Sequence, residues 1–126
     1  MDNWKLNVYI NDAGDDEIDG WLTSFLPDVE AAIRTFLKFL ITQEYLREHF
    51  VKKLKGSKKL YEVRIRHNKV QYRLLGCYGP QQKEFTLLIG TIKKGKIWNP
   101  PSAIKSAEKR YKLIYANNKY VREYDE

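Results

Sequence analysis

The chain has 126 residues, which favours one compact domain over residues 1–126 rather than two independent cores. Hydrophobic residues make up 43% of the chain and aromatic residues 13%, and this composition excludes a disordered protein. No apolar run reaches the ~18–20 residues of a membrane-spanning helix, and the acidic N-terminus lacks the pattern of a signal peptide. One cysteine and two histidines are poor material for a zinc site. We therefore expect a cytoplasmic protein without a metal, a cofactor or a membrane partner.

The charge is spread unevenly along the chain, whose formal net charge is +7. Residues 1–30 carry a net charge of −7, whereas residues 31–126 carry +14. The densest basic window runs from Arg47 to Arg73 and holds ten cations against two acids. Such a concentration indicates either a polyanionic partner such as nucleic acid or a solvated surface that only confers solubility.

The first part of the chain predicts one strand followed by helices. Alternating apolar and polar residues indicate the strand, and apolar residues spaced three and four apart indicate the helices. A proline in the first turn and acidic residues beside it suit the start of the longer helix. In chain order we expect a strand over 4–10, an acidic loop over 11–17, a short helix within 18–26, a helix from Pro27 to about Gln43, and further helix or a basic connector over 45–54.

The second part predicts three strands and a final helix. Strand-like runs occupy 60–66, 70–76 and 84–92, and the loops between them are short enough for hairpins. Three such strands imply an antiparallel meander. After a turn rich in Gly, Lys and Pro, Ser102 can cap a last helix, and residues 117–126 read as a loose tail. The fold class is therefore α+β, with an early strand and helices packed on a twisted antiparallel sheet and a C-terminal helix.

The first two of these strands have a definite register. Side chains alternate between the two faces of a strand, so pairing Ile65 with Tyr72 keeps the apolar side chains on one face. The same register places Arg64 directly opposite Arg73 on the other face. Like charges in opposite positions cost something like ~0.2–1 kcal/mol. Binding a phosphate between the two guanidinium groups would recover this cost, and two solvated arginines that splay apart are the alternative.

Three segments resemble the RelE/HigB superfamily of toxins from type II toxin–antitoxin systems, and most of all its phage-derived HigB-like branch. The order and spacing of the segments match over roughly residues 52–111, and the N-terminal third fits only in outline. The matching segments are Lys53–Ile65 (KLKGSKKLYEVRI), Tyr72–Leu75 (YRLL) and Phe85–Lys94 (FTLLIGTIKK), followed by Pro100, Pro101 and a helix with Ala107 and Arg110.

The resemblance implies a RelE-like fold and a metal-independent endoribonuclease that cleaves mRNA, usually on the ribosome. In that chemistry the 2′-hydroxyl attacks the adjacent phosphorus, and cations neutralise the growing negative charge on the phosphate. Arg64 and Arg73 would hold the scissile phosphate, and Lys94 would be the third catalytic cation. The residues that would contact RNA are Lys55, Lys58, Lys59, Arg66, Lys93 and Trp98. The implied partners are mRNA, the ribosome and a cognate antitoxin protein.

Some positions depart from the family pattern and leave the proton-transfer group unidentified. Glu62 stands where relatives of the RelE type have a lysine, and Ile89 stands where the branch commonly has a histidine. No tyrosine follows Lys94 at the place of the family's late tyrosine. His67 is the best titratable candidate by type, although its position in a turn favours an ordinary turn histidine. His49 lies on the connector and is no better.

Two other functions are compatible with the same residues. One is an RNA- or ribosome-binding module of the same fold that has lost catalysis. The other is a relative that acts on a different target such as gyrase. Trp98 is equally open, because it could stack on a base or cover the edge of the core. The acidic segment over residues 1–30 either screens part of the basic face or is a solvated loop.

Overall fold

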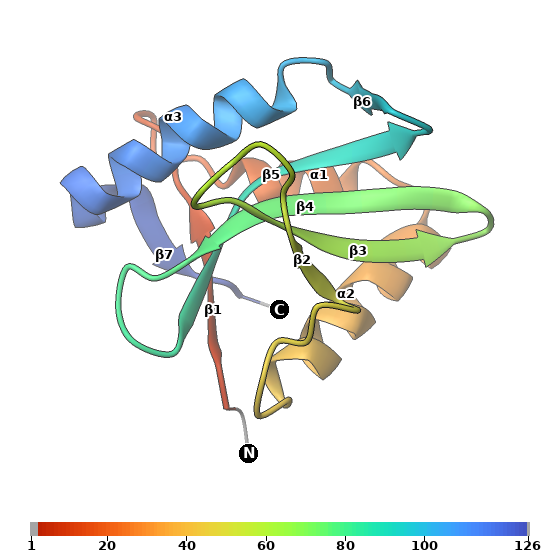
Figure 1. The fold of residues 1–126 in the computed structure, drawn as a ribbon, viewed down its shortest axis with the longest axis horizontal. Helices are drawn as coiled ribbons and strands as arrows, with labels where there is room; N and C mark the ends of the chain where they lie inside the picture. The colour runs from red at the N-terminus through yellow and green to blue at the C-terminus, as the bar shows by residue number, and fades with distance from the viewer. Residues whose placement is uncertain (1–2, 126) are drawn as a thin grey trace.

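A computed structural model describes residues 3–125 of the chain (Figure 1). Over these residues the protein is α+β, with three α-helices, a short 3-10 helix and a sheet of seven strands. The elements in chain order are β1 (Lys5–Tyr9), α1 (Glu17–Thr23), α2 (Pro27–Ile41), β2 (Val51–Lys53), β3 (Tyr61–His67), β4 (Val70–Tyr78), β5 (Glu84–Lys94), β6 (Ile97–Asn99), α3 (Ala103–Ala116), the 3-10 helix η1 (Asn118–Tyr120) and β7 (Val121–Glu123).

The sheet is built around the expected meander. Strands β3, β4 and β5 are consecutive and antiparallel, as the three strand-like runs with short connections predict. The strand order is β2-β3-β4-β5-β1-β7, and β6 pairs with the last part of β5. However, β1 runs parallel to β5 and antiparallel to β7. The sheet is therefore mixed and open, and the prediction of an antiparallel sheet is wrong for β1.

Apolar side chains lie on both faces of the sheet and form two buried clusters. On one face, residues of α1 and α2 such as Ile33 pack against Leu74 and other apolar residues of the strands. On the other face, Ala107 and its neighbours in α3 cover Leu75 and Leu88. In Figure 1, α3 lies over only part of this second face, and the hairpin of β3 and β4 extends beyond it. The exposed part of the second face carries the candidate site.

The first helix starts at Glu17, one residue before the predicted range, and the second starts at Pro27 as predicted. Before α1, the Asp16 side chain accepts a hydrogen bond from the backbone N–H of Asp19 at 2.9 Å, and this contact caps the helix. The next helix begins at Pro27, whose missing N–H is not needed in a first turn, and it places Asp28 and Glu30 at its positive end. It ends at Ile41, slightly before the predicted end.

Several short features differ from the prediction. Of the two alternatives for residues 45–54, the connector is found rather than further helix, and it ends in the unpredicted strand β2. Part of the predicted turn after β5 forms β6. Ser102 precedes α3 but makes no side-chain capping hydrogen bond. Residues 121–123 form β7 against β1, so the prediction of a loose tail is wrong for this segment, and residue 126 lies outside the described residues.

Candidate active site

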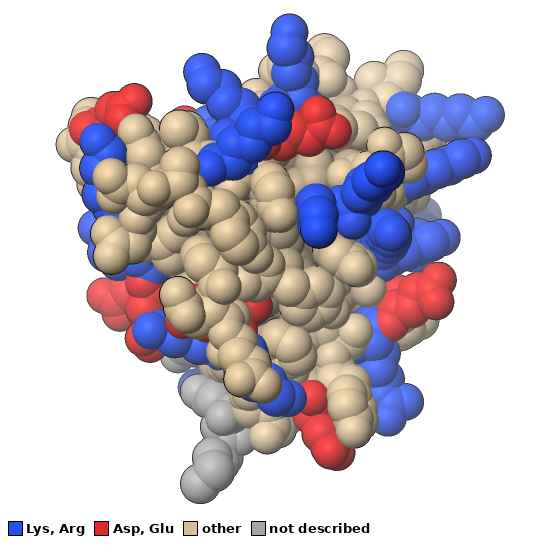
Figure 2. Space-filling model, turned by 60° about the vertical axis from the view of Figure 1, so that its left-hand side comes forward, with Lys and Arg blue, Asp and Glu red and all other residues tan. Residues whose placement is uncertain are grey.

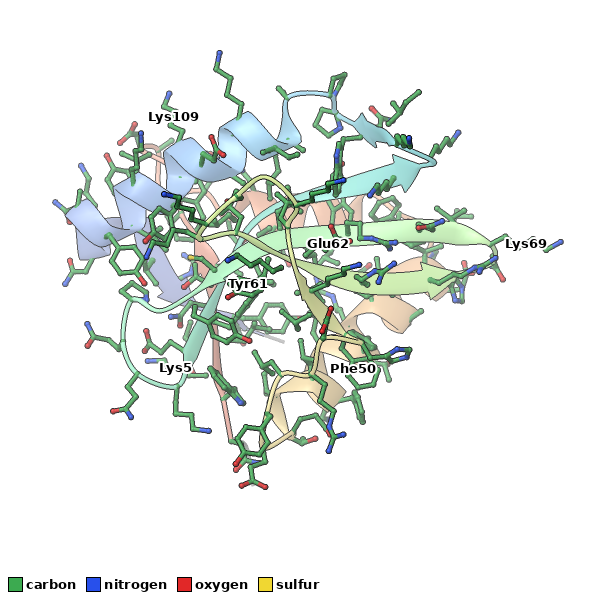
Figure 3. The ribbon with its side chains drawn as sticks, in the orientation of Figure 1. Lys5, Phe50, Tyr61, Glu62, Lys69 and Lys109 are labelled. Carbon is green, nitrogen blue, oxygen red and sulfur yellow. The ribbon has the colours of Figure 1, made fainter. Side chains whose placement is uncertain are left out.

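The hairpin of β3 and β4 has the predicted register. Ile65 pairs with Tyr72 on the face that packs against the helices, and Arg64 pairs with Arg73 on the other face. The two-residue turn between the strands consists of Asn68 and Lys69, whose φ angles of 49° and 67° give the left-handed conformation that tight hairpins favour. In Figure 3, Lys69 lies at the tip of the hairpin and Glu62 lies toward the middle of the sheet.

Registers across the neighbouring strands align the polar residues of the arginine face in rows. Residues that pair directly across a sheet project from the same face, so each row is a line of neighbouring side chains. The row nearest the hairpin tip contains Arg66, Gln71, Lys93 and Trp98; the next contains Arg64, Arg73 and Thr91; the third begins with Lys52 and Glu62 and continues into the buried Leu75.

The side chain of Arg73 is buried and tightly held. It is only 4% exposed, and its terminal nitrogens donate hydrogen bonds to the side-chain oxygen of Gln71 and, at 3.1 Å, to the backbone carbonyl of Tyr72. Burial is the strongest influence on the pKa of Arg73 and lowers it; Glu62 raises the pKa, and the charge of Arg64 lowers it. Because an arginine stays protonated in proteins and hydrogen bonds hold its terminal nitrogens, Arg73 is a fixed positive charge in the floor of the site.

Glu62 is the counter-ion of both arginines. Its Oε1 atom lies 3.3 Å from Nε of Arg73 and 3.5 Å from Nε of Arg64, and the carboxylate is nearly buried. The repulsion between the paired arginines is thus partly offset within the protein, which the sequence argument did not anticipate. The side chain of Arg64 is 40% exposed, and no hydrogen bond holds its terminal nitrogens within residues 3–125. Arg64 is therefore the arginine that is open to an incoming anion.

The two arginines line an open pocket of about 330 Å³ on this face. The other residues of its wall are Arg66, Gln71 and His49. The connector before β2 brings His49 there, because the N–H of Arg64 donates a hydrogen bond to the carbonyl of Phe50 at 2.9 Å. Sequence reasoning missed this position, since it depends on how the connector packs against the sheet edge.

His67, by contrast, lies away from this pocket. Alternation along β3 places His67 on the face of Ile65, opposite to the face of Arg64. Its Nε2 atom lies 3.3 Å from Oδ2 of Asp28 at the start of α2. The structure therefore separates His67 from the arginines and gives it a partner on the helical side of the sheet.

The two lysines at the end of β5 project from different faces. Lys93 pairs with Gln71 and with Trp98, so it lies on the face of the arginines, whereas Lys94 pairs with Ile97 and alternates to the other face. The Nζ atom of Lys93 lies 4.7 Å from the centre of the Trp98 ring. Trp98 is half-buried and packs against the second apolar cluster, so it does cover an edge of the core. The register thus places Lys93, rather than Lys94, on the face of the arginines.

The lysines of the loop between β2 and β3 lie at a second surface feature. Lys58 and Lys59 line a groove with Tyr111 and Lys112 of α3, and none of these residues lines the arginine pocket. Lys55 is exposed in the same loop. Figure 2 shows Lys and Arg side chains gathered along the upper and right-hand edges of the molecule in that view, with acidic side chains among them at few places.

The acidic N-terminal segment is bound elsewhere. Glu17 lies 3.2 Å from an Nη atom of Arg110 in α3, and Asp16 lies 3.6 Å from Arg122 in β7. Asp12 accepts a hydrogen bond from the Tyr120 hydroxyl at 2.7 Å. These contacts hold the segment against α3 and the C-terminal strand, and they give no support to the idea that it screens the arginines.

The fold and the pocket define a small α+β protein that presents paired arginines on the open part of a mixed sheet. A model of the family Phage derived protein Gp49-like (DUF891) matches residues 20–112, a range that includes every residue of the pocket, and the chain belongs to this family. The family is toxin-like and is related to the RelE/HigB toxin–antitoxin superfamily. The comparisons with curated proteins and with solved structures gave no significant match. Within residues 3–125, no helix has the length and apolar character needed to cross a bilayer.

Proposed function

We propose that this protein is the toxin of a toxin–antitoxin pair and that it acts as a metal-independent endoribonuclease on translated mRNA. The observation that carries the proposal is the pairing of Arg64 with Arg73 in an open pocket, beside Lys93 and on a strongly basic face. The membership of a toxin-like family supports the toxin role.

In the proposed reaction the 2′-hydroxyl of one nucleotide attacks the adjacent phosphorus. Negative charge then grows on the phosphate oxygens, and positive groups fixed around them lower the barrier. Arg64 donates hydrogen bonds to these oxygens, because it lines the pocket and no acceptor among residues 3–125 holds its terminal nitrogens. Arg73 adds a buried, immobile charge below them, and Lys93 takes the role of third cation that the family pattern suggested for Lys94.

The remaining basic residues fit contacts to the RNA backbone. Arg66 is in the wall of the pocket, and Lys58 and Lys59 line the groove beside α3. Phosphate contacts of this kind supply affinity without reading sequence. An antitoxin that inhibits the protein would cover this face with an acidic or amphipathic segment, since such a segment offers carboxylates to the same cations.

Expression in bacteria without an antitoxin tests the proposal. We expect growth arrest and new 5′ ends on translated mRNA, mapped by primer extension, and we expect Arg64→Ala to relieve both. Arg64→Ala is preferred to Arg73→Ala because Arg64 is partly exposed and its loss leaves no cavity. Arrest with intact mRNA and ribosome-bound protein would favour the non-catalytic module, and arrest with trapped DNA breaks would favour a gyrase-directed relative.

A further inference from the structure

Most of the residues in the wall of the arginine pocket are unsuited to moving a proton. Three of its five residues are arginines, which keep their charge near neutral pH, and Gln71 does not ionise. The fifth residue is His49, and an imidazole is the side chain that most often serves as a general acid or base. His49 is therefore the residue of this pocket whose side chain is suited to proton transfer.

The position of His49 is fixed by local structure, although its side chain is exposed. The N–H groups of Phe50 and Val51 both donate hydrogen bonds to the carbonyl of Arg47, at 2.9 and 2.8 Å. These bonds close a tight turn that contains His49. The ring of His49 packs edge-on against Phe50, with 4.9 Å between centroids. Phe50 in turn packs against Phe36 of α2, so the turn is anchored to the core.

Two other titratable side chains are less suitable. Glu62 lies below the arginines, and its Oε1 atom is already between their Nε atoms, so it serves as their counter-ion. His67 lies on the other face of the sheet beside Asp28. Among the described residues, His49 alone combines exposure to solvent, a place in the pocket wall and an imidazole.

We propose that His49 is the general base of the cleavage reaction, an inference that rests on the proposed function. Neutral His49 accepts the proton of the attacking 2′-hydroxyl while the bond from O2′ to phosphorus forms. The bond from phosphorus to O5′ breaks, its electron pair goes to O5′, and this oxygen takes a proton from water. The resulting hydroxide takes the proton from His49 and restores the neutral imidazole. The products are a 2′,3′-cyclic phosphate and a 5′-hydroxyl.

The test compares His49→Gln with the matched control His67→Gln on translating ribosomes. Proton transfer by a positioned side chain is worth about 10²- to 10⁴-fold in rate. We therefore expect His49→Gln to slow cleavage by this factor and His67→Gln to leave it near that of the wild type. Both variants should keep the melting temperature of the wild type, because neither side chain is buried. If His49→Gln lowers it, His49→Asn is measured in the same way.

A modified substrate then identifies which proton His49 moves. After the cleavage site has been mapped, an mRNA with sulfur in place of O5′ at that site provides a leaving group that needs no proton. Slow cleavage of this mRNA by His49→Gln supports the base role, and cleavage at the wild-type rate overturns it. Full activity of His49→Gln on ordinary mRNA overturns the inference while leaving the arginine site intact. If the wild type itself cleaves no mRNA, the proposed function fails and the inference fails with it.

Discussion

The carboxylate of Glu62 lies 3.3 Å from Nε of Arg73, and both side chains are almost completely buried. A buried charge is costly unless an opposite charge lies near it, so these two residues stabilise each other in place. The pair also explains a departure of the sequence from its relatives. A lysine at position 62 would add a third positive charge to the paired arginines, whereas the glutamate reduces their repulsion.

The first prediction concerns this pair. Glu62→Gln should lower the free energy of unfolding by up to about 3 kcal/mol, because Arg73 would keep its buried charge and lose its counter-ion. Urea unfolding followed by circular dichroism measures the change. Glu48→Gln removes an exposed carboxylate from the neighbouring connector and should have little effect. Equal stability of the two variants would mean that the contact between Glu62 and Arg73 contributes nothing.

The second prediction separates the two lysines at the end of β5. Lys93→Ala should reduce mRNA cleavage by about 10²-fold, which is typical for the loss of one group that stabilises charge in the transition state. Lys94→Ala should have a much smaller effect, because Lys94 alternates to the opposite face of the strand. Primer extension on translated mRNA gives both rates. The reverse order of effects would return the third-cation role to Lys94.

The third prediction concerns the groove beside α3. Changing Lys58, Lys59 and Lys112 to Gln should weaken binding to ribosomes and make it less dependent on salt. Each lost phosphate contact should lower the slope of log affinity against log salt by about 0.7 to 0.9. Lys38→Gln, on α2 and therefore on the other side of the sheet, is the control and should leave the slope unchanged. An unchanged slope in the triple variant would remove the groove from the RNA interface.

The fourth prediction tests how closely α1 packs on β5. A Cβ atom at Gly90 would lie 2.2 Å from the Trp21 ring, so Gly90→Ala should cost about 1–3 kcal/mol of stability through overpacking. Gly20 lies in α1 one residue before Trp21, and a Cβ atom there meets nothing within 4 Å. Gly20→Ala should therefore stabilise the protein by roughly 0.5–1 kcal/mol, the ordinary gain in a helix. Urea unfolding of both variants decides whether the contact is as tight as described.

Local patterns were sufficient to predict the central part of this fold. Apolar alternation and a two-residue turn determine the register of β3 and β4, and that register brings Arg64 and Arg73 together. The short strands β2, β6 and β7 could not be predicted, because three residues with few apolar side chains carry no measurable period. The parallel pairing of β1 with β5 joins segments far apart in the chain and leaves no local signal.

In the candidate site, too, the residues on regular strands could be placed from the sequence, and those that depend on irregular or distant contacts could not. The arginines and Lys93 lie on regular strands, so alternation assigns each to a face. His49 lies on an irregular connector, and its place in the pocket follows from the hydrogen bond between Arg64 and Phe50. Glu62 was visible as a departure from the RelE-type pattern, but its role as a counter-ion required the positions of both guanidinium groups.

The position of β1 between β5 and β7 has a consequence for the order of folding. The pairings of β2 with β3, of β3 with β4 and of β4 with β5 join strands that are close in the chain, so these pairings require the closure of short loops only. The pairing of β1 with β5 and with β7 must close very long loops, which makes it entropically costly and slow. The strands that carry the arginines can therefore assemble while the chain is still being extended. The opposite edge of the sheet is completed only after residue 123 has been added.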